Sequence, residues 1–285
     1  MSKSSCCAPE AENSNSHQEH DGHRQNVRDA YAKVAQASNE AADCGIASSC
    51  CGVSDDDAIN TLISTRIGYS EDDLAAVPTG ADMGLGCGNP RAIASLKPGE
   101  VVVDLGSGGG FDCFLAAHEV GQSGKVIGID MTPDMLSKAR TNAEQGKFNN
   151  VEFRLGEIEN LPVADNTADV IISNCVINLS PNKAQVFKDA FRILKPGGRL
   201  AISDVVATVE LPAEMKNDPA LIAGCMGNAS LIGALETMLK ESGFECVRIE
   251  PKDESKEFIQ DWAPEHNVTD YVVSASIEGV KPSLS

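Results

Sequence analysis

The chain has 285 residues, of which 42% are hydrophobic and only 4% aromatic, enough apolar material for one large domain with extensions. Its formal net charge of −19 argues against nucleic acid or an anionic membrane surface as a partner. No apolar run approaches the roughly 18 residues that span a bilayer, and the N-terminus lacks the apolar core of a signal peptide, so we expect a cytoplasmic protein without a membrane partner. In a reducing cytoplasm its ten cysteines are expected to be ligands, redox groups or buried packing residues rather than a disulfide framework.

The N-terminal part of the chain divides into two regions. Residues 1–25 are polar and predict a disordered tail, although Cys6, Cys7 and three histidines spaced by three could hold a soft metal. Residues 26–97 form a cysteine-bearing extension, which begins with an amphipathic helix over 26–37 and continues with a cysteine-rich loop at 44–52. Further helices are expected over 55–65, 71–76 and 91–96.

From residue 98 onward strands and helices alternate, which predicts an α/β domain over 98–285 with a parallel sheet covered on both faces. The segment 206–230 departs from this alternation and is expected to contribute to substrate binding. The strands are expected over 101–103, 125–129, 151–155, 170–173, 199–205, 246–250 and 271–277, with helices over 111–120, 133–144, 183–194 and 232–242.

A glycine-rich turn follows the first strand and favours one ligand class. Asp104 begins a D-x-G-x-G-x-G pattern, which is neither the G-x-G-x-x-G fingerprint of dinucleotide-binding proteins nor a phosphate-binding loop. Asp130 ends the second strand, at the place where a carboxylate meets ribose hydroxyls. A carboxylate at the strand end repels a pyrophosphate but can hold an ammonium group. The pattern therefore indicates S-adenosyl-L-methionine.

Several reactive side chains follow the strands of this sheet. Because ligands bind at the C-terminal ends of parallel strands, Asp104, Asp130 and Glu157 should share one crevice with Cys175. Glu157 and the backbone around Ile158 are expected at the adenine. Cys225 follows the fifth strand on the same side. The cysteines lack the C-x-x-C spacing of a structural zinc site, and thiolates select soft ions, so a trivalent arsenic atom fits them as the methyl acceptor.

Five segments give the chain a family resemblance. DLGSGGGFDCF at 104–114, IGIDMTP at 127–133, SNCVINL at 173–179, KPGGRLAISD at 195–204 and Gly224-Cys225 resemble the arsenite methyltransferase family, a class I methyltransferase family. The resemblance implies a Rossmann-like, seven-stranded sheet and methylation of arsenite for detoxification. It also implies that four thiols are functional and that the last three bind arsenic: Cys51, Cys87, Cys175 and Cys225.

Cys50 is the alternative to Cys51, which we prefer. We expect a monomer. Because methylation formally oxidises arsenic, we also expect a thiol reductant such as thioredoxin or glutathione. The resemblance further implies that S-adenosylmethionine is bound by Asp104, Gly106, Ser107, Gly108, Asp130, Met131, Glu157, Ile158 and Asn174.

Two other functions stay open from the residues alone. The first is a class I methyltransferase that acts on carbon or oxygen of a small lipid-like acceptor, in which serine replacements of Cys175 and Cys225 would be mild. The second is a thiol-based metalloid-binding protein without turnover, in which the pattern around Asp104 would have no use. Cys113 on an apolar helix face and Cys246 at a strand start are expected to be core residues.

Overall fold

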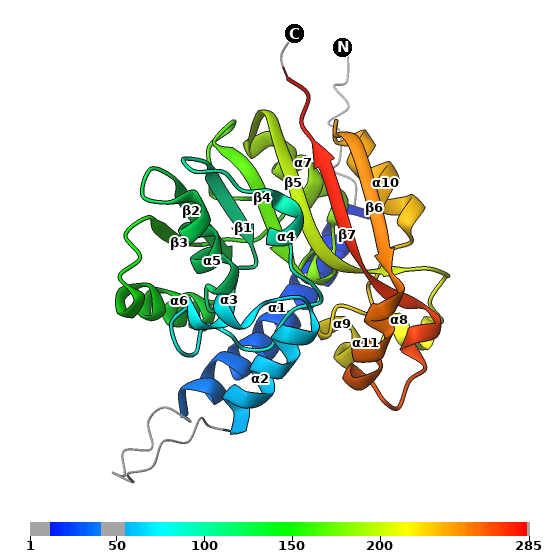
Figure 1. Ribbon diagram of the computed structural model, residues 1–285. Helices are drawn as coiled ribbons and strands as arrows, with labels where there is room; N and C mark the ends of the chain where they lie inside the picture. The colour runs from blue at the N-terminus through cyan, green and yellow to red at the C-terminus, as the bar shows by residue number, and fades with distance from the viewer. Residues whose placement is uncertain (1–11, 41–54, 284–285) are drawn as a thin grey trace, which may run out of the picture.

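The computed structural model describes residues 12–40 and 55–283, which fold around one seven-stranded sheet (Figure 1). The strand order is β3-β2-β1-β4-β5-β7-β6, with β7 antiparallel to β5 and β6 and the other neighbours parallel. This confirms the predicted α/β class. The strands are β1 (Val101–Leu105), β2 (Lys125–Asp130), β3 (Val151–Leu155), β4 (Ala168–Asn174), β5 (Leu194–Ala207), β6 (Glu245–Lys252) and β7 (Val272–Val280).

Helices cover both faces of the sheet, as its apolar strands require. Successive residues of β1 show how: Val102 packs with the core under one set of helices and Val103 with the core under the other. The first face is covered by α4 (Arg91–Ala94), α5 (Phe111–Val120) and α6 (Pro133–Gly146). The second is covered by α7 (Lys183–Ile193) and α10 (Ile232–Glu241).

The N-terminal region forms more structure than the sequence predicted. Helix α1 spans Glu12–Glu40, so the prediction of a wholly disordered tail over residues 1–25 is wrong for residues 12–25. Contacts far along the chain fix this helix: His23 Nε2 lies 2.9 Å from the carbonyl oxygen of Leu179, and Arg28 Nε donates to the carbonyl oxygen of Met131 at 3.2 Å. Helices α2 (Asp55–Arg66) and α3 (Glu71–Ala75) lie close to their predicted ranges.

Short helices close the edge of the sheet where β1, β2 and β4 end. The segment 206–230 forms α8 (Ala213–Lys216) and α9 (Pro219–Ala223), and α11 (Lys256–Trp262) lies beside them (Figure 1). Apolar residues of these helices form one core cluster with Val27 of α1. Single-turn 3₁₀ helices complete the fold at η1 (Ile177–Leu179), η2 (Asp253–Ser255) and η3 (Val268–Asp270).

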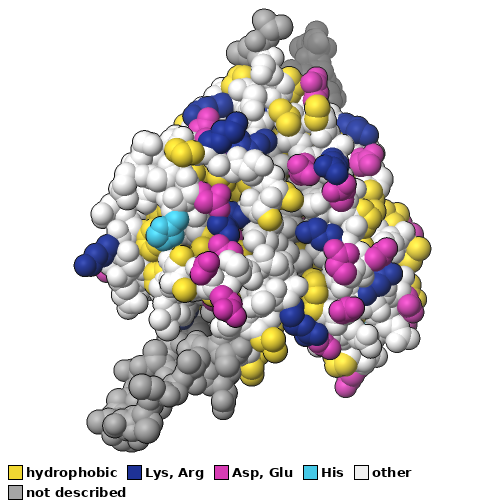
Figure 2. Space-filling view, viewed as in Figure 1, with side chains coloured by type: hydrophobic (Ala, Val, Ile, Leu, Met, Phe, Trp, Pro, Cys, Tyr) yellow, Lys and Arg dark blue, Asp and Glu magenta, His cyan; other side chains and the backbone are white. Residues whose placement is uncertain are grey.

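Two surface features complete the description. On the face shown in Figure 2, acidic and basic side chains are interspersed, so no patch of one sign dominates it.

Cys113 is fully buried, as predicted, whereas Cys246 is exposed, so its assignment to the core is wrong. The physical reason is that β6 is an edge strand whose first two residues are both exposed. None of the helices in the described ranges is long and apolar enough to cross a membrane.

Candidate active site

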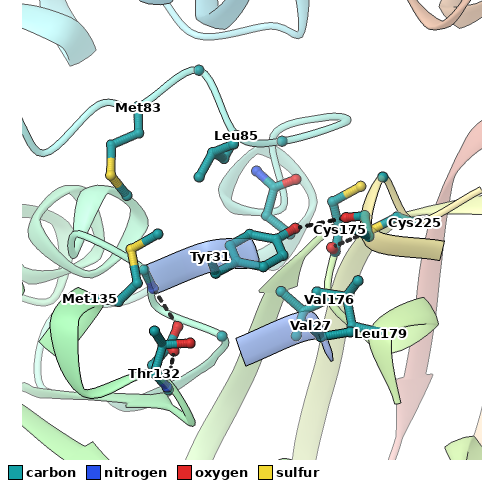
Figure 3. Close-up of a pocket in the computed structure, with 18 of the residues that line it drawn as sticks. Val27, Tyr31, Met83, Leu85, Thr132, Met135, Cys175, Val176, Leu179 and Cys225 are labelled. Atoms are coloured by element: carbon teal, nitrogen blue, oxygen red, sulfur yellow. Dashed lines mark hydrogen bonds between the residues drawn. The ribbon is translucent and has the colours of Figure 1, made fainter. Parts of the chain in front are cut away.

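A cavity of about 670 Å³ lies at the edge of the sheet where β1, β2 and β4 end, with α1 across it (Figure 3). Arg24, Val27 and Tyr31 of α1 form part of its wall. Most of the residues that the sequence assigned to the site line it: Asp104, Gly106, Ser107, Gly108, Asp130, Met131, Ile158, Asn174, Cys175 and Cys225.

The glycine turn after β1 forms one end of the cavity. Gly106 has a φ of 72°, and a Cβ atom there would lie 2.4 Å from Cγ2 of Val176, so only glycine fits. Asp130 fastens the turn from β2, because its carboxylate accepts hydrogen bonds from the backbone N–H of Gly108 at 2.9 Å and of Thr132 at 2.8 Å. The turn and the carboxylate are therefore held in a fixed relation at the mouth of two neighbouring strands.

The same end of the cavity is rich in buried carboxylates. Asp104 and Asp112 are 3% and 8% exposed, and burial raises the pKa of both; the negative charge of Asp112 raises the pKa of Asp104 further. Cys113 Sγ donates to Asp104 at 3.2 Å, and the hydroxyl of Tyr69 donates to Asp112 at 2.6 Å. Carboxylates in this setting favour a cationic ligand, because an adjacent positive charge stabilises their ionised form.

S-adenosylmethionine fits this end of the cavity. Its ammonium and sulfonium groups supply the positive charge that Asp104 and Asp112 favour, and the glycine turn admits a ligand close to the backbone. Ser107 supports the same conclusion, because it lines the cavity and its buried Oγ has no hydrogen-bond partner among the described residues.

Two cysteines line the other end of the cavity, and a third lies next to one of them. Cys175 follows β4, and Cys225 follows α9, where its Sγ donates to the carbonyl oxygen of Cys175 at 2.6 Å (Figure 3). Cys87, on the loop before α4, is 1% exposed; its Sγ, the Sγ of Cys175 and a carboxylate oxygen of Asp204 all lie within 4.8 Å of one another. The chain thus brings together thiols from three distant segments.

Cys87 and Cys175 lie in surroundings that favour their protonated form. Hydrogen bonds with the thiols of Cys225 and Cys87, together with burial, raise the pKa of Cys175 well above its ordinary value. Burial likewise raises the pKa of Cys87. Asp204 lies beside them and accepts hydrogen bonds from the backbone N–H of Ile177 and Val205, while burial raises its pKa to about 6.

Some predicted site residues stand apart from this arrangement. Glu157 does not line the cavity; its carboxylate pairs with Arg24 and Arg28 of α1 at 3.3 and 3.4 Å, while the neighbouring Glu159 lines the wall. Cys87 is next to Cys175 without lining the cavity. Cys51 and its alternative Cys50 lie outside the described residues.

Several residues of the site have little or no signal in the sequence. Tyr31 lies within the predicted helix 26–37 and Tyr69 between the predicted helices 55–65 and 71–76, and neither position indicates a side chain that enters a cavity. Asp112 had a weak signal, since it lies in the first turn of α5, directly after the glycine turn. Asp204 ends the motif at 195–204 and was quoted only as part of it.

Comparisons with known proteins agree with this geometry. A family model described as a methyltransferase domain matches residues 96–243. The chain is 53% identical over 261 residues to an arsenite methyltransferase of Halobacterium salinarum, a match that covers 91% of this chain and 67% of the relative. It is 44% identical over 171 residues to an arsenite methyltransferase of Aquipseudomonas alcaligenes, covering 58% of this chain and 49% of that protein.

A solved structure gives the same result. The arsenic(III) S-adenosylmethionine methyltransferase from Chlamydomonas reinhardtii superimposes with a TM-score of 0.57 at 30% sequence identity, over 78% of this chain and 73% of that one. The chain spans about two thirds of the Halobacterium relative and about half of the Aquipseudomonas relative. Fold, domain family and extended identity agree: this chain is a member of the arsenite S-adenosylmethionine methyltransferase family of class I methyltransferases.

Proposed function

We propose that this chain transfers a methyl group from S-adenosylmethionine to trivalent arsenic and so serves arsenic detoxification. The observation that carries the proposal is that Cys175 and Cys225 line one end of a cavity, with Cys87 directly behind Cys175, while the other end suits a cationic nucleoside ligand. The relatives named as arsenite methyltransferases support the choice of acceptor.

The donor end is assigned to residues around the glycine turn. We assign the ammonium group to Asp104 and Asp112, the ribose to Asp130, and the buried edge of the adenine to Ile158. Met131, Gly106, Ser107 and Gly108 complete the wall. Bound there, S-adenosylmethionine supplies an electrophilic methyl group on a positively charged sulfur.

The thiols capture the acceptor. Each thiol displaces one hydroxide from arsenous acid, its proton leaves with that hydroxide as water, and an arsenic–sulfur bond forms. Three such exchanges leave arsenic with its lone pair and hold it beside the donor, so much of the rate enhancement comes from positioning the two reacting atoms. The lone pair of the bound arsenic then forms the new carbon–arsenic bond while the sulfur–methyl bond of the donor breaks; the electrons of that bond stay on sulfur, and neutral S-adenosylhomocysteine is the leaving group.

The arsenic is formally oxidised by this step and needs two electrons to return to the trivalent state. We propose that protein thiols supply them by forming a disulfide, with Cys51 as the fourth thiol, and that an external thiol reductant such as thioredoxin or glutathione regenerates the cysteines. We further propose that the chain works as a monomer in the cytoplasm.

A transfer assay with methyl-labelled S-adenosylmethionine tests the proposal, with arsenic species separated from other products. The expected result is methylarsenical that forms only when arsenite and a thiol reductant are both present. Label that appears in another acceptor, at a rate independent of arsenite, would assign the chain to carbon or oxygen methylation instead. Tight arsenite binding without transfer would make it a metalloid-binding protein.

A further inference from the structure

Two hydrogen bonds hold the backbone of Cys87, one on each side of the residue. Its N–H donates to Oδ1 of Asn174 at 3.1 Å, and its carbonyl oxygen accepts from the hydroxyl of Ser274 at 2.6 Å. Asn174 is the last residue of β4 and lines the cavity, whereas Ser274 is buried in β7 and does not. The position of the Cys87 thiol therefore depends on one residue of the cavity wall and one residue of the sheet interior.

The same Asn174 side chain reaches the carboxylate end of the cavity. Its Nδ2 donates to the carbonyl oxygen of Gly88 at 2.8 Å, and lies 3.0 Å from the hydroxyl of Tyr69 and 3.3 Å from Oδ2 of Asp112. An amide nitrogen has two hydrogens, and here it faces three acceptors, so one hydrogen is shared between the phenol and the carboxylate. A ligand that pairs with the carboxylate of Asp112 therefore changes how this hydrogen is shared between Asp112 and Tyr69.

The segment that carries Cys87 packs closely against its neighbours. A Cβ atom on Gly86 would lie 2.9 Å from Nδ2 of Asn174, and a Cβ atom on Gly88 would lie 2.9 Å from the hydroxyl of Ser203. Gly86 therefore lies directly against the amide, and Gly88 against β5, with no room for a larger side chain at either position. Because Oδ1 of Asn174 accepts from the backbone N–H of Cys87, a displacement of the amide changes the hydrogen bond that positions Cys87.

We infer that Asn174 is a positioning residue that couples binding of the methyl donor to binding of arsenic. When the donor's ammonium group pairs with Asp112, the shared amide hydrogen of Asn174 bonds to the hydroxyl of Tyr69 alone. The amide is then fixed in one orientation and holds segment 86–88 in the position where Cys87 contacts Cys175. This inference rests on the proposed function. Since coupling between two binding sites is reciprocal, arsenite tightens donor binding by the same factor.

The test uses the full chain and measures binding rather than turnover. Trp262 is the chain's one tryptophan and lines the cavity, so its fluorescence reports arsenite binding. Arsenite is titrated alone and with saturating S-adenosylhomocysteine, which has the ammonium group but no methyl group to transfer. Couplings between sites are typically about 5- to 150-fold, and we expect the arsenite Kd to fall by about tenfold. Methylthioadenosine, which has the nucleoside but no ammonium, should leave the Kd unchanged.

Variants assign the coupling to the amide. In Asn174→Ala the two arsenite Kd values should agree to within a factor of about two, although both ligands still bind. Tyr69→Phe removes only the hydroxyl and should reduce the coupling, which keeps the test informative if Asn174→Ala folds poorly. Ser274→Ala is the matched control: it removes the other hydrogen bond to Cys87, so both Kd values should rise together and their ratio should persist.

Two results would overturn the inference: a wild-type ratio of one, or a wild-type ratio retained in both Asn174→Ala and Tyr69→Phe. Either result is meaningful only when the wild-type protein binds both arsenite and S-adenosylhomocysteine. Absence of arsenite binding in the reduced wild-type protein would instead contradict the proposed function itself. The two failures are therefore distinguishable in a single set of titrations.

Discussion

The thiol of Cys225 donates a hydrogen bond to the carbonyl oxygen of Cys175 at 2.6 Å, although 50 positions separate the two residues. Both have left-handed backbones, with φ of 58° at Cys175 and 64° at Cys225. Such conformations cost a non-glycine residue on the order of 1–3 kcal/mol and persist only where the surroundings fix them. Asn228 is part of that support, since its Nδ2 donates to the carbonyl oxygens of Asn178 and Ser180, both at 2.9 Å.

The positive φ of Cys175 predicts that two inactive variants at this position differ in stability. Cys175→Gly should have a free energy of unfolding about 0.5–1 kcal/mol higher than that of Cys175→Ala, because glycine adopts a positive φ without a steric penalty. Both variants should bind S-adenosylhomocysteine and fail to methylate arsenic. Urea unfolding and calorimetric titration measure the two properties; an alanine variant as stable as the glycine variant would contradict the role of strain.

The glycine turn gives a second prediction. Gly106→Ala should weaken binding of S-adenosylhomocysteine and lower stability, because its Cβ would meet Val176, the residue after Cys175. Gly233→Ala in the first turn of α10 is the matched control, since a Cβ there has no atom within 4 Å and the variant should bind the donor normally. Calorimetric titration of both variants checks the pair. Equal donor affinity in the two would show that the turn does not approach the donor.

The ion pairs of α1 give a third prediction. Arg24 is paired with Glu157 and Glu159 at 3.3 and 3.4 Å, and the side chain of Glu159 is 5% exposed. Arg24→Met should raise the KM for S-adenosylmethionine and expose α1 to proteolysis, because it leaves a buried carboxylate without its cation. Arg66→Met, which breaks an exposed pair with Asp261, should change stability by less than about 1 kcal/mol. Equal proteolysis of both variants would contradict a role for Arg24 in holding the helix.

The fold was predictable where its sequence signals are local. Strand ranges were correct to within a few residues because apolar runs such as 151–155 end in turns. The length of β5 was underestimated, because this strand includes Lys195-Pro196-Gly197-Gly198, a sequence that usually ends a helix or strand. The first half of α1 could not be predicted, because its residues are polar and it is held by contacts such as that of His23 with Leu179, far along the chain.

The site was predictable only in part for the same reason. Residues at strand ends, such as Asp104 and Cys175, follow from the rule that parallel strands place their C-terminal ends at one edge. Tyr31, Tyr69 and Asp112 enter the cavity from helices and loops whose direction depends on packing, which no sequence period encodes.

The buried Lys183 gives a prediction about pH. Its Nζ donates to the carbonyl oxygen of Asn228 and to the hydroxyl of Ser230, and burial lowers its pKa to about 8 from about 10.4 in an unfolded chain. Between these values the unfolded state binds more protons, so this group's contribution to stability is present above about pH 10.4 and is lost as the pH falls through about 8.

The measurement compares the free energy of unfolding of wild type and Lys183→Met from pH 7 to pH 10. Other titrating groups cancel in the difference, so wild type should gain stability over the variant as the pH rises. Each unit of pKa difference is worth about 1.4 kcal/mol. Lys240→Met, at a lysine with 60% of its side chain exposed, should follow wild type in parallel. Parallel curves for Lys183→Met would contradict a depressed pKa at this site.

A single-turnover experiment tests the central claim most directly. Reduced protein is loaded with one equivalent of arsenite, freed of excess, and mixed with methyl-labelled S-adenosylmethionine, and the label is followed by rapid quench. We expect about one labelled methyl per bound arsenic in wild type, and no transfer in Cys175→Ser despite normal binding of S-adenosylhomocysteine. Unchanged transfer in Cys175→Ser, or an arsenic that stays bound and unmethylated in wild type, would contradict it.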